Sequence, residues 1–251
     1  LAWMRYDETP VSDYLLALDQ TQSFATAHYQ AYPHPGEPNP IADLMIYDLD
    51  TGETTRLAVR DGQPFTDEVV GHYIWDAQWT AAGDEILVHR AERLQKVHDL
   101  AACAIATGAC RSVVRETRPQ SWAEGEDPVF LEDGNRFIWT SERTGFRNFY
   151  LYDLSGQLIA PLTRHALDVV DVLSIDESRN EVWYTARSGD NHMKIQLHRV
   201  GLDGDGDVRL TDPSMHHTPE PSPNHRYFVD VSETHDVAPV SHLFDRAGEK
   251  I

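Results

Sequence analysis

The sequence is short of positive charge, of cysteine and of long apolar runs. Its 251 residues hold 21 Lys and Arg against 41 Asp and Glu, which leaves a net charge of −20. A surface this negative repels phosphate backbones and anionic lipid headgroups, so we expect neither nucleic-acid binding nor membrane docking. The longest apolar run, about 100–106, is far shorter than the roughly 20 residues of a membrane-spanning helix. No membrane insertion is therefore predicted.

The chain also lacks an initiator methionine and a secretion signal. It begins with Leu1, and no positively charged segment followed by an apolar stretch comes after it. We expect either that a presequence has been removed or that the sequence is cut from a longer protein. A content of 41% hydrophobic and 10% aromatic residues is too high for a disordered chain and is sufficient for a sizeable core.

One sequence phrase recurs along the chain. An apolar strand ends near Asp-Leu and is followed by a Gly turn and a second short strand. Aligned on that position, the copies lie 46 to 54 residues apart, at Asp48, Asp99, Asp153, Arg199 and Asp245. A strand, a turn and another strand precede each of the last four copies, so each period holds about four short strands and no convincing helix. This pattern predicts an all-β propeller of about five four-stranded blades.

The repeat also sets the predicted blade boundaries. We expect the blades to cover 1–60, 61–115, 116–164, 165–212 and 213–251. Residues 1–6 already read as an inner strand with nothing before it, so the first blade is predicted to be incomplete.

Residues 14–40 interrupt the first blade with an inserted hairpin. Two strand-like segments, 14–22 and 24–32, precede a Pro-rich passage that ends at Pro40. Inserted hairpins commonly project as arms whose free edges pair with another chain. The alternative is an ordinary extended blade edge. The candidate dimer-arm residues are Tyr14, Leu16, Phe24, Tyr29 and Tyr32.

Several motifs make the sequence recognisable as a whole. Residues 32–40 read Tyr-Pro-His-Pro-Gly-Glu-Pro-Asn-Pro, and residues 141–154 read Ser-Glu-Arg-Thr-Gly-Phe-Arg-Asn-Phe-Tyr-Leu-Tyr-Asp-Leu. With Tyr-Asp-Glu at 6–8, Gln-Trp-Thr at 78–80 and Arg-Leu-Gln at 93–95, they resemble the N-terminal propeller of the dipeptidyl peptidase IV family. This family of serine exopeptidases lies in the prolyl oligopeptidase clan, and the likeness is strongest to its bacterial members.

The resemblance implies a function in a larger enzyme. Family members cleave an N-terminal dipeptide that has Pro or Ala in second position. A C-terminal α/β-hydrolase domain carries a Ser-Asp-His triad, and an eight-bladed propeller gates peptide access and supports homodimers. This chain resembles the later blades. The glutamate pair that holds the substrate ammonium group would lie before Leu1, and no Gly-x-Ser-x-Gly nucleophile motif occurs. We therefore assign no catalytic residue and no cofactor, and we do not expect this chain alone to hydrolyse peptides.

The loop before residues 129–131 is where the family places side chains near the substrate pocket. Here it reads Gln-Ser-Trp-Ala-Glu-Gly over 120–125 and does not match the aromatic-basic pair of the animal enzymes. Trp122 and Glu124 are the candidate subsite residues. The alternative for Trp122, and the commoner arrangement, is a tryptophan buried between blades.

The two cysteines lie close together in one predicted hairpin. If its loop covers 105–108, Cys103 and Cys110 face each other across two strands, where a disulfide is geometrically possible. A register that differs by one residue would place them on opposite faces as two buried thiols. Family members carry a disulfide at what resembles this hairpin. A bridge would indicate an oxidising compartment, so a periplasmic or secreted location is expected.

Two clusters of metal-ligating residue types are weighed and set aside. Asp203, Asp205 and Asp207 alternate as in a calcium loop, but the twelfth position is Ser214 rather than Glu, so a hairpin turn is preferred. The adjacent histidines at 216–217 point to opposite faces of a strand, and neither they nor His225 has a spaced partner to complete a site. No metal is predicted.

Two other functions compete with this interpretation. The chain could be a free-standing five-bladed propeller that binds a protein or a glycan, in which case residues 243–251 would complete the first blade. It could also be a structural domain stabilised by calcium at the aspartate-rich turn.

Overall fold

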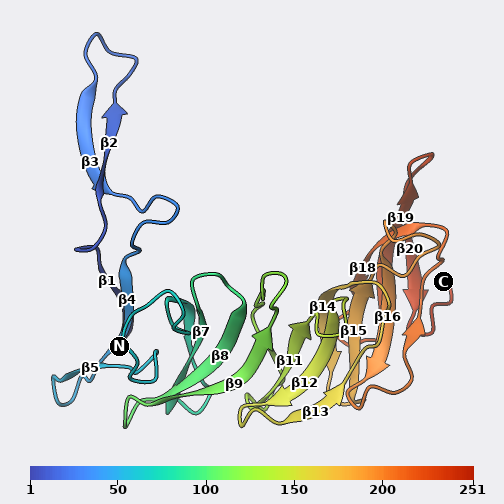
Figure 1. The fold of residues 1–251 in the computed structure, drawn as a ribbon. Coiled ribbons are helices and arrows are strands. Elements are labelled where there is room, and N and C mark those ends of the chain that lie inside the picture. The colour runs from blue at the N-terminus through green and yellow to red at the C-terminus, as the bar shows by residue number, and fades with distance from the viewer. The chain divides into compact units, whose positions relative to one another are not determined.

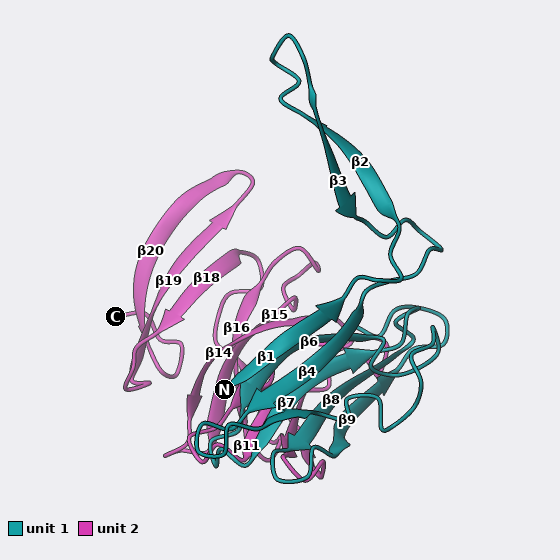
Figure 2. Ribbon diagram, turned by 90° about the vertical axis from the view of Figure 1, so that its left-hand side faces the viewer, with its two compact units in different colours: residues 1–124 teal, residues 125–251 magenta.

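The computed structural model describes all residues from Leu1 to Ile251 and consists of β-strands without helices (Figure 1). It therefore contains no helix that could cross a membrane. The strands form six antiparallel sheets. By their internal contacts they divide into two compact units, residues 1–124 and residues 125–251 (Figure 2).

The first unit contains two packed sheets and a hairpin. The first sheet has three strands, β1 (Ala2–Asp7), β4 (Ile41–Tyr47) and β5 (Thr54–Arg56). The second has four, β6 (Tyr73–Trp79), β7 (Glu85–Ala91), β8 (Val97–Ala104) and β9 (Cys110–Thr117). Leu44 and Ile46 of the first sheet pack with Ile86, Val88 and Ala101 of the second in one apolar core.

The second unit contains three sheets in chain order. The first holds β10 (Val129–Phe130), β11 (Arg136–Ser141), β12 (Asn148–Asp153) and β13 (Leu158–Pro161). The next holds β14 (Val169–Asp176), β15 (Glu181–Ala186), β16 (Gln196–Gly201) and β17 (Val208–Arg209). The last holds β18 (His216–Pro221), β19 (Tyr227–Thr234) and β20 (Val237–Asp245). One apolar cluster joins the first two sheets, and a second joins β15 and β16 to Phe228 and Phe244 of the last.

In each blade sheet, strands that follow one another in the chain lie side by side, apart from the inserted hairpin, which confirms the predicted all-β, propeller-like fold. Only the three middle sheets have the predicted four strands. The first sheet has three, as expected for an incomplete blade. The last sheet also has three, and after β20 the chain turns back and pairs with it through a bridge between Phe244 and Lys250. Within this sheet β20 pairs with β19. β9 continues to Thr117, two residues past the boundary expected at 115.

The inserted segment forms a sheet of its own. β2 (Asp13–Leu18) and β3 (Thr26–Ala31) pair from Asp13 with Ala31 to Leu18 with Thr26. They are shorter than the predicted segments because residues 19–25 form the turn. This hairpin stands away from the blade strands in Figure 1, and it is therefore not an extension of the first blade's edge.

The second sheet carries a charged core. Arg90 on β7, Asp99 on β8 and Arg115 on β9 lie directly opposite one another in the strand register. The Asp99 carboxylate is fully buried and accepts from Arg90 at 3.2 Å and from Arg115 at 2.6 and 2.8 Å. The two guanidinium groups offset the free-energy cost of removing the Asp99 carboxylate from water, which would be large without them.

Candidate functional sites

The arm, the hairpin of β2 and β3, exposes aromatic side chains on a two-stranded sheet. Phe24 is 89% exposed and Tyr29 is 66% exposed, while Tyr14 and Tyr32 are also solvent-accessible and Leu16 is half-buried. An isolated two-stranded hairpin is at best marginally stable in water, and its apolar side chains gain free energy when another surface covers them. The arm therefore has the composition of an interaction surface.

Aromatic rings and one half-buried amide fix the root of the arm. The Tyr14 ring lies 5.9 Å from that of Tyr32 and 5.1 Å from that of His34. In the Pro-rich segment, the Asn39 amide nitrogen lies 2.9 Å from the Tyr73 hydroxyl and 2.9 Å from Nε2 of His72. The asparagine of the Tyr-Pro-x-x-Gly-x-x-Asn-Pro motif thus ties the segment to the second sheet.

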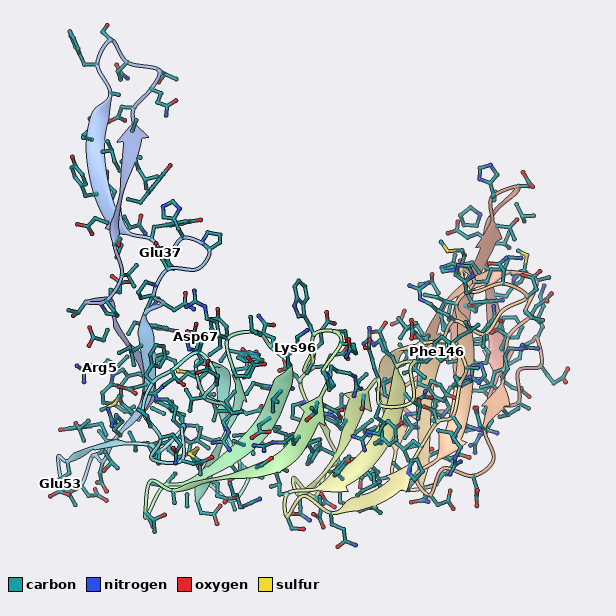
Figure 3. All side chains as sticks on the ribbon, in the orientation of Figure 1. Arg5, Glu37, Glu53, Asp67, Lys96 and Phe146 are labelled. Carbon is teal, nitrogen blue, oxygen red and sulfur yellow. A yellow bond between two sulfur atoms is a disulfide. The ribbon has the colours of Figure 1, made fainter.

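A second tie to the same segment is a hydrogen bond from an arginine. Arg93 donates to the main-chain carbonyl of Glu37 and forms an ion pair with Asp67 at 3.1 Å. Both partners of this arginine, Glu37 and Asp67, are labelled in Figure 3. The segment that leads out of the arm is therefore bound to the blade at two places, and the direction of the hairpin strands above it is constrained.

The loop that contains the predicted subsite residues is held by main-chain contacts. The Ala123 amide donates to the Gln95 carbonyl at 2.7 Å, and Nζ of Lys96 donates to the Ser121 carbonyl at 3.0 Å. Trp122 is 67% exposed, and the Glu124 side chain is exposed as well. The expectation of a tryptophan buried between blades is therefore wrong. With Ala123 turned inward and anchored, its neighbour at 122 faces solvent.

A disulfide joins Cys103 and Cys110 in the hairpin of β8 and β9. The two residues are directly opposed in the strand register, and the carbonyl of Ala104 accepts from the Gly108 amide in the intervening turn. Cys103 lies in the apolar core of the first unit, so the bridge connects an outer strand to that core.

The second unit has an open pocket of about 540 Å³ beside β12 and β13. Phe146, Tyr150, His165 and Arg143 are among its lining residues. The Arg143 guanidinium lies 4.1 Å from the centre of the Tyr150 ring and donates to the Tyr152 hydroxyl at 2.6 Å. This wall combines an apolar surface with a cation that is already in contact with two rings.

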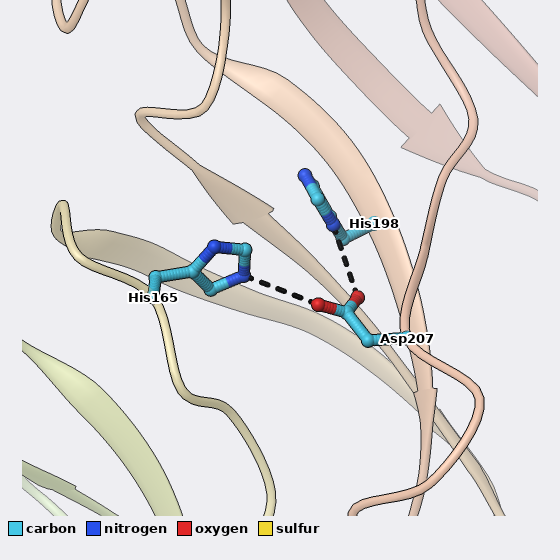
Figure 4. A group of neighbouring side chains, drawn as sticks. All are labelled: His165, His198 and Asp207. Atoms are coloured by element: carbon cyan, nitrogen blue, oxygen red, sulfur yellow. Dashed lines mark hydrogen bonds and ion pairs between the residues drawn. The ribbon is translucent and has the colours of Figure 1, made fainter.

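Next to this pocket, three side chains from separate segments converge (Figure 4). His165 lies between β13 and β14, His198 is on β16, and Asp207 directly precedes β17. Asp207 Oδ1 lies 3.0 Å from Nδ1 of His198, and Asp207 Oδ2 lies 3.4 Å from Nε2 of His165. The Tyr184 hydroxyl donates to Asp207 Oδ1 at 2.8 Å and is 2.8 Å from Nε2 of His165.

The local environment sets the protonation of this cluster. Burial, reinforced by the nearby His198, lowers the pKa of His165. Burial would raise the pKa of Asp207, but hydrogen bonds from His198 and Tyr184 outweigh it, and the net pKa is lowered. Burial and the charge of Asp207 raise the pKa of the Tyr184 hydroxyl. At neutral pH the cluster thus holds an anionic carboxylate, a neutral His165 and a neutral phenol.

Of the groups weighed as metal ligands from the sequence, Asp207 belongs to the histidine cluster, whereas the others have separate partners. Asp203 accepts the Asp205 amide at 3.0 Å inside the turn that joins the paired strands β16 and β17, which confirms the predicted hairpin turn. His217 lies between Asp230 and the Asp212 carbonyl, at 2.7 and 2.8 Å.

The other two histidines have partners elsewhere. His216 accepts the Ile195 amide at 3.3 Å, and His225 lies 3.7 Å from Asp176. Sequence reasoning overlooked His165 and His198, which are 33 residues apart in the chain. Two features bring the cluster together: the pairing of Tyr184 with His198 in the register of β15 and β16, and the loop in which Asn148 holds His165.

Comparison with known proteins agrees with the fold and the motifs. A family model described as the dipeptidyl peptidase IV N-terminal region matches residues 1–239. The chain belongs to this family. A protein named probable dipeptidyl peptidase 4 from Aspergillus fumigatus is 22% identical over 195 residues, which cover 73% of the chain and 25% of that protein. The crystal structure of Porphyromonas gingivalis dipeptidyl peptidase 4 is 19% identical with a TM-score of 0.76, over 99% of this chain and 34% of that one.

The dipeptidyl peptidase IV N-terminal region is shared by proteins with different names. A mouse relative named inactive dipeptidyl peptidase 10 is 24% identical over 215 residues, or 81% of this chain and 26% of that protein. The chain spans about a quarter of the length of these curated relatives. Membership therefore establishes the region to which the chain corresponds and leaves the activity of the whole protein to a proposal.

Proposed function

We propose that the chain is the propeller region of a serine exopeptidase that removes N-terminal dipeptides ending in Pro or Ala. In this proposal the propeller gates peptide access to a C-terminal α/β-hydrolase domain and supports a homodimer through the arm. The family match over residues 1–239 supports the enzyme context. The exposed aromatic surface of the arm is the observation that carries the role in dimerisation.

The test of the arm is its removal. Replacing residues 14–32 by a short turn leaves the Asn39 and Arg93 ties in place, so the blades are expected to stay folded while the dimer is lost. Sedimentation velocity on the chain and on the full-length protein measures this. Phe24→Ser combined with Tyr29→Ser is expected to weaken the dimer in the same direction. Met193→Ser, at a residue that is 66% exposed in the second unit, is the matched control. An unchanged dimer without the arm refutes this role.

The role in gating is tested at Trp122. Its exposed ring on an anchored loop would lie against the peptide beyond the scissile bond, so Trp122→Ala in the full-length protein is expected to raise KM for longer peptides several-fold. A dipeptide chromogenic substrate is expected to be hydrolysed with little change. Leu49→Ala, at an exposed residue in the turn between β4 and β5, serves as the control. Equal kinetics for Trp122→Ala and wild type with every peptide length would contradict the proposal.

We also propose a periplasmic or secreted location. The disulfide between Cys103 and Cys110 supports it, because such bridges persist in oxidising compartments and are rare in a reducing cytosol. Fractionation of the native host with an antibody to the full-length protein tests the location. Recovery of the protein with the reduced cytosolic fraction would contradict it.

A further inference from the structure

We propose that His165, His198 and Asp207 form a binding site for a divalent transition metal ion, with Zn²⁺ as the best match. Their ligand atoms, one from each residue, all lie within 4.8 Å of one another. The proposal concerns the second unit only and does not depend on the peptidase function proposed above.

The spacing of the donor atoms is close to that of a tetrahedral site. With metal–nitrogen and metal–oxygen distances of about 2.0–2.1 Å, two ligands of tetrahedral zinc lie about 3.3 Å apart. The Asp207 carboxylate oxygens lie 3.0 Å from Nδ1 of His198 and 3.4 Å from Nε2 of His165. These contacts involve different carboxylate oxygens, so the Asp207 carboxylate would rotate to direct one oxygen at an ion held by both imidazoles. A water molecule would complete the fourth position, next to the Tyr184 hydroxyl, which lies 2.8 Å from Nε2 of His165 and 2.8 Å from Asp207 Oδ1.

Supporting contacts hold the His198 imidazole and the main chain of His165. The Ser188 hydroxyl lies 2.6 Å from Nε2 of His198, which leaves Nδ1 of that ring directed at Asp207. The buried side chain of Asn148 accepts from the His165 amide at 2.8 Å and donates to the His165 carbonyl at 3.1 Å. A contact such as that of Ser188 with the second ring nitrogen fixes the orientation and tautomer of a metal-binding imidazole, while Asn148 fixes the position of the His165 main chain.

The donor set also selects the class of ion. Two imidazoles and one carboxylate suit zinc and its neighbours, whereas calcium and magnesium require mainly oxygen ligands. A net charge of −20 further favours the approach of a cation.

The site would tie two neighbouring sheets together. His165 follows the sheet that ends with β13, whereas His198 and Asp207 belong to the next sheet and its last turn. These two sheets already share one apolar core. A bound ion is thus expected to stabilise their packing, because an ion that binds only the folded state raises the unfolding free energy.

The test uses the chain after removal of metal by a chelator. Competition with a chromophoric indicator measures Zn²⁺ affinity and stoichiometry, and Co²⁺ reports the ligand geometry through its visible absorption. We expect one ion per chain, the absorption of four-coordinate cobalt, and a higher melting temperature with Zn²⁺.

Conservative variants locate the ion. Asp207→Asn and His198→Asn keep the shape of the cluster and are each expected to weaken binding at least about 100-fold, since a direct ligand is lost. Asp205→Asn in the same turn is the control and is expected to bind as wild type does. If either site variant fails to fold, which circular dichroism reports, the cobalt spectrum of the wild-type chain still decides. Absence of stoichiometric binding, an octahedral spectrum without imidazole ligation, or full binding by a folded Asp207→Asn overturns the proposal.

Discussion

The buried histidine pair of the second sheet predicts a specific sensitivity to acid. His98 on β8 is fully buried, its Nε2 lies 2.9 Å from Nδ1 of His89 on β7, and its ring centre lies 5.3 Å from that of Trp75. Burial, with the neighbouring His89 as the next cause, lowers the pKa of His98 from 6.5 to about 4. The folded chain therefore holds His98 neutral at a pH where the unfolded chain protonates it.

The sign and size of the effect follow from this difference in pKa. The lowered pKa in the folded state means that stability is complete above the unfolded value of 6.5 and is lost as the pH falls towards 4. One pKa unit corresponds to about 1.4 kcal/mol, so the full loss is about 3 kcal/mol, of which about 2 kcal/mol falls between pH 7 and pH 5. Other titrating groups contribute to the same range, so a difference between variants is the quantity to measure.

Urea unfolding at pH 7, 6 and 5 provides that measurement. His98→Gln removes the titrating group and is expected to be less stable at pH 7, but to lose about 2 kcal/mol less than wild type on going to pH 5. His28→Gln, at an exposed position of the arm, is expected to follow the wild-type pH dependence. If His98→Gln and wild type lose the same free energy of unfolding between pH 7 and pH 5, the reasoning is refuted.

Three further predictions concern stability. Asp99→Asn leaves the buried Arg90 guanidinium with Asp61 as its one remaining carboxylate and is expected to cost about 3 kcal/mol in urea unfolding, and a loss below about 1 kcal/mol would contradict the buried network. Reduction of the Cys103–Cys110 bridge, whose partners are 7 residues apart, is expected to cost about 2 kcal/mol by loss of loop constraint, and equal melting temperatures with and without reductant would argue against it. Gly71→Ala places a Cβ 2.6 Å from a main-chain carbonyl at a φ of +106°, whereas Gly83→Ala at a φ of +73° meets nothing within 4 Å. Thermal melts should show the larger loss for Gly71→Ala, and the reverse order would be inconsistent with the close approach of the Val59 carbonyl to Gly71.

Repetition in the sequence is sufficient to predict the fold, because each blade repeats the same short strands and turns. The copies of the phrase around Asp99 and Asp153 fall on β8 and β12, as the repeat requires. The last sheet has three strands where four are predicted, although the residues after Asp245 follow the turn pattern and pair back onto β20, with Ile251 donating to the Leu243 carbonyl at 3.0 Å. A turn motif indicates the reversal of the chain but not how many residues pair after it.

The side chains that matter for the candidate sites are less predictable, for a physical reason. A large apolar side chain such as that of Trp122 is more often buried than exposed. Here the hydrogen bond from the Ala123 amide to the Gln95 carbonyl holds the loop so that the Trp122 ring faces solvent. His165 and His198 give no local signal, because their proximity depends on strand register and on a loop that Asn148 holds. The sequence pattern indicates which face of a strand is buried. Contacts between segments that are distant in the chain can be predicted only when the register of the paired strands is known.

The role of the arm in dimerisation and the metal site involve different residues, so either can be refuted without the other. The arm and Trp122 lie in residues 1–124, and the histidine cluster lies in residues 125–251. Removal of the arm changes no ligand of the cluster, so a chain that loses its dimer but still binds one Zn²⁺ would support both ideas. A chain whose dimer depends on Zn²⁺ while the arm is dispensable would instead place self-association in the second unit. Because a bound ion could itself join two chains, the oligomeric state can be assigned to the arm only when the metal content of the chain is known.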